Sequence, residues 1–292
     1  MFDRIVLATD LSSDWDQIIG CAQEFKVLGC TQAILTHVFM TKGLVGADTA
    51  AHSESQPKLE AQKQQLESQG FEVIVETPVG LPAFSLNDVA QHHCASLIVV
   101  GSHGKSAWRE AILGSVSNAV LHHARFPILL INVDRLKEGG QGGTCQLRTT
   151  ELLRHVLFPT DFSQVANGAA AYLEYLAPRG LSKVTILHAL EVLDAYPLAV
   201  LEPAETAAQG FLGVLENRLK AAGVPWIHTR ISKGHPISII LDSLKTEDFS
   251  LVVMGAQGKS LLSEILLGSV AYNVARLAPC PVLLVPRKAV SD

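Results

Sequence analysis

The sequence predicts two tandem α/β domains, each a parallel β-sheet with helices on both faces. The chain repeats itself: residues 97–131 and 251–285 align without a gap at an offset of 154, with 16 of 35 positions identical. In each half, apolar runs alternate with helical patterns, and continuous apolar strands are typical of parallel sheets buried on both faces. The length of 292 residues suits two domains of about 150 residues each.

In the first half, the short apolar run IVLA is bounded by turn formers and predicts a buried strand. Further apolar runs follow, and the run FEVIVET alternates as a half-buried strand does. The expected strands are 5–8, 33–39, 71–77, 97–100 and 127–133. Helical patterns cover 14–28, 86–94 and 115–124, and a polar helix ends at Gly70, a residue suited to a C-cap. The second half shows the same alternation of strand and helix patterns.

Further matches locate the two domains. The openings RIVLATDLSS (4–13) and HVLFPTDFSQ (155–164) correspond, as do 80–82 (GLP) and 234–236 (GHP). A period of about 150 residues is too long for a solenoid and indicates two whole domains. Residues 134–151 are polar and carry two Gly-Gly pairs, a composition typical of a flexible connection. We therefore expect domains at 1–138 and 153–292, joined by a linker at 139–152.

Composition excludes several classes of protein. With 23 basic and 28 acidic side chains, the formal charge is −5, which argues against a broad nucleic-acid-binding face. No apolar run approaches the roughly 20 residues of a membrane span, and the first ten residues do not resemble a signal peptide. The five cysteines are scattered without a C-x-x-C motif, a pattern typical of reduced thiols in the cytoplasm. We expect a cytoplasmic protein without a nucleic-acid or membrane partner.

A doubled glycine motif carries the chemistry of the sequence. Each copy reads Gly-x2-Gly-x9-Gly-Ser, beginning where the fourth strand ends and finishing before an amphipathic helix. The residues are Gly101, Gly104, Gly114 and Ser115 in the first copy and Gly255, Gly258, Gly268 and Ser269 in the second. Glycine admits a ligand close to the backbone, and the free N–H groups at a helix start favour an anion such as phosphate. Glycine and serine are common at such places for purely structural reasons, but the identical spacing in both copies favours binding.

Other features of the sequence narrow the ligand. Thr9-Asp10 and Thr160-Asp161 end the first strands, where ligands of parallel sheets bind, and can reach a base or ribose. A Walker A loop is excluded because its first glycine is replaced by Val99 and Val253. No G-x-G-x-x-G fingerprint follows the first strand, so a dinucleotide site of that type is also excluded.

With these motifs and the closing P-[VI]-L-L run, the chain resembles the universal stress protein family in its tandem form. The resemblance implies five-stranded sheets of order 3-2-1-4-5, like the adenine nucleotide alpha hydrolases, and an ATP site accompanied by Mg²⁺, with ADP or AMP as alternatives. The implied nucleotide-binding residues are Ala8, Thr9, Asp10, Val38, Val100, Gly101, Gly104, Gly114, Ser115 and Val116 in the first domain, and Pro159, Thr160, Asp161, Ala189, Met254, Gly255, Gly258, Gly268, Ser269 and Val270 in the second. One departure is that Ser96 and Ser250 stand where the family often has aspartate.

The motifs and the resemblance are compatible with three functions. The first is a stress-response sensor or regulator that binds ATP, with its domains paired through their last strands and its chains paired as homodimers. The second is a slow ATP hydrolase or self-phosphorylating protein, with Ser115 or Ser269 near the γ-phosphate, although no general base stands beside either serine in the sequence. The third is a scaffold that works without nucleotide.

Several histidines are conspicuous but are not assigned to a metal site. Neighbouring residues on a helix point about 100° apart, so His92, His93 and Cys94 cannot converge on one ion. His37 and His188 correspond between the copies, and we interpret them as hydrogen-bonded structural residues beside the site.

Overall fold

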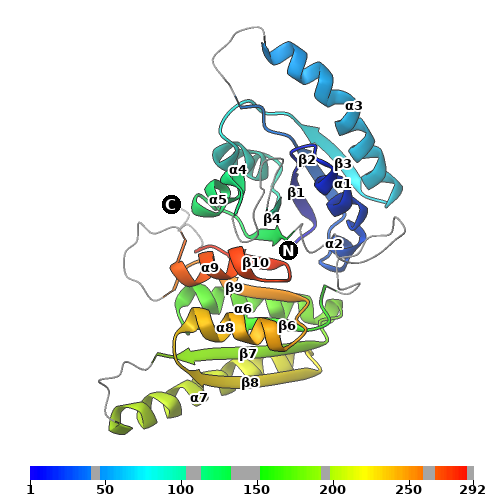
Figure 1. Ribbon diagram of the computed structural model, residues 1–292. Helices are drawn as coiled ribbons and strands as arrows, with labels where there is room; N and C mark the ends of the chain where they lie inside the picture. Colours follow the sequence, from blue (N-terminus) through cyan, green and yellow to red (C-terminus); the bar gives the residue numbers. More distant parts are fainter. Residues whose placement is uncertain (41–46, 103–112, 133–151, 192–197, 259–266, 288–292) are drawn as a thin grey trace. The chain divides into compact units, whose positions relative to one another are not determined.

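The computed structural model describes residues 1–40, 47–102, 113–132, 152–191, 198–258 and 267–287. The chain forms two compact units, unit 1 at Met1–Thr150 and unit 2 at Glu151–Ala289. The expected linker at 139–152 lies, except for its last residue, outside the described residues. Each unit is described by itself, and its elements are labelled in Figure 1.

Unit 1 holds a five-stranded parallel sheet. Its elements are β1 (Arg4–Ala8), α1 (Ser13–Gly20), α2 (Gln23–Val27), β2 (Gln32–Thr36), α3 (Ala47–Ser68), β3 (Glu72–Glu76), α4 (Pro82–His92), β4 (Leu97–Gly101), α5 (Ser115–His122) and β5 (Ile128–Ile131). The strand order is β3-β2-β1-β4-β5, and all four pairings are parallel. The predicted order 3-2-1-4-5 is therefore confirmed.

Unit 2 repeats this plan. Its elements are β6 (Val156–Pro159), α6 (Gln164–Leu176), a 3₁₀ turn (Ala177–Arg179), β7 (Lys183–Leu190), α7 (Leu198–Ala222), β8 (Trp226–Lys233), α8 (Pro236–Thr246), β9 (Leu251–Gly255), α9 (Ser269–Leu277) and β10 (Val282–Val285). The strands run in the order β8-β7-β6-β9-β10, all parallel, which is the same order as in unit 1.

Helices cover both faces of each sheet, as predicted. In unit 2, α6 and α7 lie together on one face while α8 and α9 lie together on the other (Figure 1). The central strands β4 and β9 are buried at every position, which explains their continuous apolar sequences. The edge strand β3 does not show the alternation that its sequence predicted: its five residues are exposed or half-buried without a period of two, and Val75 is exposed.

The first helical pattern of unit 1 differs from the expectation. Residues 14–28 form two short helices, α1 and α2, because the helix ends at Gly20, a residue that weakens helices. The backbone N–H of Gln23 then bonds to Oε1 of Gln69 at 3.1 Å instead of continuing the first helix. A tertiary contact at the end of α3 thus stabilises the break.

The serine that replaces aspartate before β9 has a structural role. Ser250 is fully buried, and its Oγ accepts a hydrogen bond from the backbone N–H of His155 at 2.9 Å. The same hydroxyl lies 3.0 Å from the carbonyl oxygen of Leu152. It therefore ties the segment before β6 to the start of β9.

The cysteines correct one expectation. Cys30, Cys94 and Cys280 are free thiols, as predicted. Cys21 is disulfide-bonded, so the expectation of five reduced thiols is wrong for this residue and the cysteines no longer argue for a reducing compartment. Across the described residues, no helix is long and apolar enough to span a membrane.

Candidate nucleotide site in each unit

A pocket of about 490 Å³ lies at the carboxyl edge of the unit 2 sheet. Ligand pockets of parallel sheets lie at this edge, where neighbouring strands connect in opposite directions. Its lining includes all ten residues expected in this unit: Pro159, Thr160, Asp161, Ala189, Met254, Gly255, Gly258, Gly268, Ser269 and Val270. The turn after β6, the end of β7, the loop after β9 and the start of α9 thus meet around one cavity.

A tight turn after β6 holds the Thr-Asp pair in place. The hydroxyl of Thr160 accepts a hydrogen bond from the N–H of Phe162 at 3.1 Å, and Oδ1 of Asp161 accepts one from the N–H of Ser163 at 2.9 Å. Phe162 has a left-handed backbone, with φ of 62°. These side chains substitute for backbone partners in the turn, and the carboxylate of Asp161 is fixed at the rim of the pocket.

The carboxylate of Asp161 approaches the glycine loop closely. A Cβ atom added to Gly258 would lie 2.9 Å from Oδ2 of Asp161, closer than real Cβ contacts. A side chain at this position would therefore displace Oδ2 of Asp161, whose Oδ1 is held by the N–H of Ser163. The first-strand aspartate and the second motif glycine, 97 positions apart in the sequence, form one structural unit.

Helix α9 begins at the pocket. The N–H of Gly268 bonds to the carbonyl oxygen of Ala256 at 2.7 Å, and the carbonyl oxygen of Gly268 accepts the first helical bond, from Tyr272, at 2.9 Å. The N–H groups of the first helical turn have no intrahelical acceptor. Because Ser269 and Val270 also line the pocket, this helix start can bind an anion.

The corresponding histidines play matching roles. Nδ1 of His188 lies 2.8 Å from the carbonyl oxygen of Thr160, and Nδ1 of His37 lies 2.8 Å from that of Thr9. Both rings line their pockets. The interpretation as hydrogen-bonded structural residues beside the site is confirmed, since each ring joins the second strand to the first.

Unit 1 has a smaller pocket, of about 300 Å³, at the corresponding edge. The Thr-Asp turn is the same: the N–H of Leu11 bonds to the Thr9 hydroxyl at 3.0 Å, and that of Ser12 bonds to Asp10 Oδ1 at 3.0 Å. The expected residues that line it are Ala8, Thr9, Asp10, Val38, Val100, Gly101, Gly114, Ser115 and Val116. Gly104, the tenth, lies outside the described residues.

Some lining residues were not expected from the sequence. Pro82 and Pro236, at the starts of α4 and α8, line their pockets. The repeated Gly-x-Pro triplets at 80–82 and 234–236 were a signal that could have identified them. Trp15 and Ser117 also line the unit 1 pocket. No repeated motif marks them in the sequence, since the corresponding residues of unit 2 are different ones, Ala166 and Ala271.

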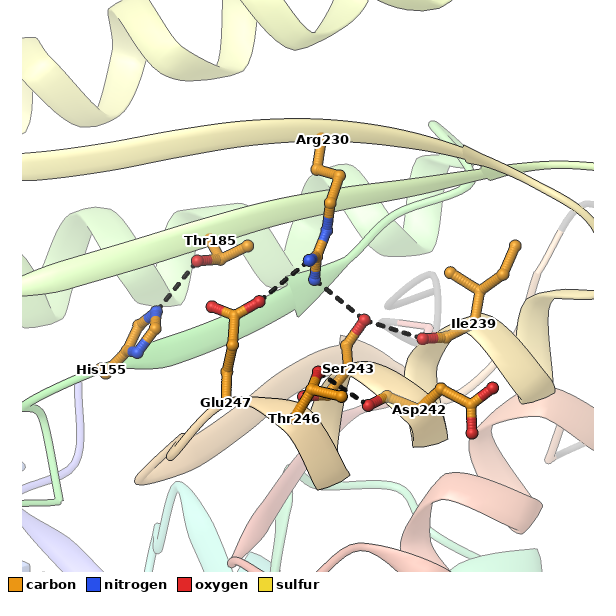
Figure 2. Close-up of polar contacts among 8 residues, drawn as sticks. All are labelled: His155, Thr185, Arg230, Ile239, Asp242, Ser243, Thr246 and Glu247. Carbon is orange, nitrogen blue, oxygen red and sulfur yellow. Dashed lines mark hydrogen bonds and ion pairs between the residues drawn. The ribbon is translucent and has the colours of Figure 1, made fainter.

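Two further groups of polar contacts in unit 2 involve no pocket residue. Arg230 on β8 forms an ion pair with Glu247 at 2.9 Å and a hydrogen bond with Ser243 at 2.9 Å (Figure 2). His155 lies 2.9 Å from the hydroxyl of Thr185, and its burial, assisted by Lys183, lowers its pKa from 6.5 to about 4. The Arg230 contacts join α8 to β8, the His155–Thr185 contact joins the start of β6 to β7, and none of these residues lines the pocket.

The fold and sites define a class of protein: tandem α/β domains, each with a pocket between a Thr-Asp turn and a glycine-preceded helix start. The model of the universal stress protein family matches residues 1–132 and 153–286. The chain therefore belongs to the universal stress protein family.

Individual relatives agree with this assignment. A universal stress protein of Methanocaldococcus jannaschii is 33% identical over 146 residues, which cover 47% of this chain and 84% of that protein. One from Mycolicibacterium smegmatis is 26% identical over 226 residues, or 75% of this chain and 70% of that protein. The crystal structure of a universal stress protein from Archaeoglobus fulgidus matches the fold with a TM-score of 0.77 and 24% identity, over 98% of this chain and 99% of that chain.

Proposed function

We propose that this protein binds ATP, accompanied by Mg²⁺, at the carboxyl edge of its sheet and acts as a regulator in a stress response. The observation that carries the proposal is the constellation in unit 2. There a fixed carboxylate and an open helix start face one cavity of about 490 Å³. That volume lies well within the range of about 300–1,000 Å³ of small-molecule sites.

Each part of the pocket suits one part of a nucleotide. The carboxylate of Asp161 accepts hydrogen bonds and suits the hydroxyls of a ribose. The N–H groups at the start of α9 suit phosphate oxygens. Ala189 and Met254 supply apolar surface for a base.

Charge balance favours a divalent cation with the phosphates. The charged groups among the described lining residues are Asp161 and Glu191, both acidic. A helix start offsets only about half a charge, so a triphosphate there requires further positive charge. Mg²⁺ commonly binds substrate phosphates together with protein carboxylates and water, so it would supply this charge beside the phosphates.

Direct analysis of the purified protein tests the proposal. Denaturation followed by chromatography identifies any nucleotide carried through purification. Equilibrium binding of labelled ATP, with and without Mg²⁺, then gives the affinity. A folded protein that carries no nucleotide and ignores ATP with Mg²⁺ would overturn the proposal and favour the scaffold. Release of inorganic phosphate at a steady rate would instead favour the hydrolase.

A double variant, Gly114→Val with Gly268→Val, tests where the nucleotide binds. A Cβ at Gly268 would lie 3.4 Å from the carbonyl oxygen of Ala256 and 3.7 Å from the backbone N of Gly258, so the valine methyl groups would crowd the glycine loop that lines the pocket. We expect affinity to fall at least about tenfold, or about 1.4 kcal/mol. Gly210→Val, on the exposed side of α7 with no atom within 4 Å of its Cβ, is the matched control. Unchanged affinity in the folded double variant contradicts the assignment.

A further inference from the structure

The two pockets differ at one position of the first helix. The chain openings align at an offset of 151, which pairs Trp15 on α1 with Ala166 on α6. Both residues line the pocket of their own unit. Trp15 is only 3% exposed, so its indole is packed inside the structure and not turned out to solvent.

The indole accompanies a loss of space. The pocket of unit 1 measures about 300 Å³, against about 490 Å³ for that of unit 2. The smaller value lies at the lower limit of the range of about 300–1,000 Å³ for small-molecule sites. Trp15 and Ala166 stand at corresponding places in the lining of the smaller and the larger pocket.

A hydrogen-bonded chain starts at Thr9, which lines the unit 1 pocket. The hydroxyl of Thr9 donates to Oε1 of Gln62 at 2.9 Å, and Nε2 of Gln62 donates to Oδ1 of Asp16 at 2.8 Å. Gln62 is only 2% exposed. When Gly70 and Gly223, the glycines that follow α3 and α7, are aligned, Leu215 stands in place of Gln62, and its apolar side chain cannot form this hydrogen bond.

From these differences we infer that nucleotide binds to unit 2 alone, because Trp15 fills the space in unit 1 that Ala166 leaves open in unit 2. This inference rests on the proposed function and assigns it to one of the two pockets. Trp15 is then the residue that excludes nucleotide from unit 1. The Thr9 hydroxyl donates its proton to Gln62, so it is engaged within unit 1.

Calorimetric titration of the full chain with ATP and Mg²⁺ tests the inference through its stoichiometry. We expect one nucleotide per chain in the wild-type protein. We expect none in Gly268→Val, since unit 1 offers no second site, while the control Gly210→Val retains one. No binding to wild-type protein would overturn the proposed function itself. Two nucleotides per wild-type chain would overturn only the inference, as would one nucleotide that remains in folded Gly268→Val and is lost when Gly114→Val is added.

Removal of the indole provides a gain-of-function test. In Trp15→Ala we expect a second nucleotide per chain, bound in unit 1, and still one nucleotide when Gly268→Val is added. Circular dichroism establishes that each variant is folded. A folded Trp15→Ala that still binds one nucleotide refutes the role of Trp15. Should the large-to-small change prevent folding, the stoichiometry of wild type and Gly268→Val decides the inference alone.

Discussion

Acidification should destabilise unit 2 through His155. The imidazole is 6% exposed, and burial, the largest cause, lowers its pKa from 6.5 to about 4. Because the folded pKa lies below the unfolded value, protonation favours the unfolded chain. The stabilisation by neutral His155 is complete above about pH 6.5 and is lost as the pH falls toward 4. The full loss is about 3 kcal/mol, at about 1.4 kcal/mol per pKa unit, and about 2 kcal/mol of it is gone at pH 5.

The charged groups around the ring act in both directions. Lys183 and Arg154 lower the pKa of His155, whereas Glu247 raises it. Glu247 is itself paired with Arg230 (Figure 2). Desolvation remains the dominant cause, so the direction of the shift follows from burial.

The assay compares wild type with His155→Gln, which removes the titrating ring. Urea denaturation at pH 8 and pH 5, followed by hydrogen exchange of the β6 amides, reports the free energy of unfolding of unit 2. We expect wild type to lose about 2 kcal/mol more than the variant over this interval. His235→Gln, at an exposed position of the same unit, is the matched control. A His155 ring that titrates near pH 6.5 by NMR, or equal losses in wild type and His155→Gln, would refute the reasoning.

Three further predictions follow from packing at other positions. Gly258→Ala should weaken ATP binding about tenfold, or about 1.4 kcal/mol, because the new Cβ would lie 2.9 Å from Oδ2 of Asp161 and displace that carboxylate. An unchanged affinity in calorimetry would contradict this prediction. Ser250→Ala should lower the free energy of unfolding by about 1–3 kcal/mol, because the buried N–H of His155 and the carbonyl of Leu152 lose their partner. Urea denaturation that shows no loss of stability would exclude this role of Ser250. Iodoacetamide at pH 8 should modify Cys280 far more slowly than exposed Cys94, because burial raises the pKa of Cys280 to about 12. Equal rates of modification by mass spectrometry would show that the Cys280 thiol is accessible.

Much of the fold could be predicted from local sequence. The run Leu251–Gly255 is apolar at every position because β9 is covered on both faces, so its sequence needs no partner to be recognised as a buried strand. The repeat located the Thr-Asp pairs and the glycine motif in both units. Strand order followed from family resemblance, since the pairing of β1 with β2 and β4 depends on contacts between distant residues.

The tertiary structure alone decided how the sites differ. The sequence placed Asp161 and Gly258 in two separate motifs. Only folding brought them so close that a Cβ on Gly258 would lie 2.9 Å from Oδ2 of Asp161. Trp15 has no motif that marks it, because its effect depends on the direction in which a buried ring points. The sequence thus determined the family, the elements and the edge of the sheet where a ligand binds, through periodicity and repeated motifs. The size of each pocket was decided by long-range packing, which no local pattern records.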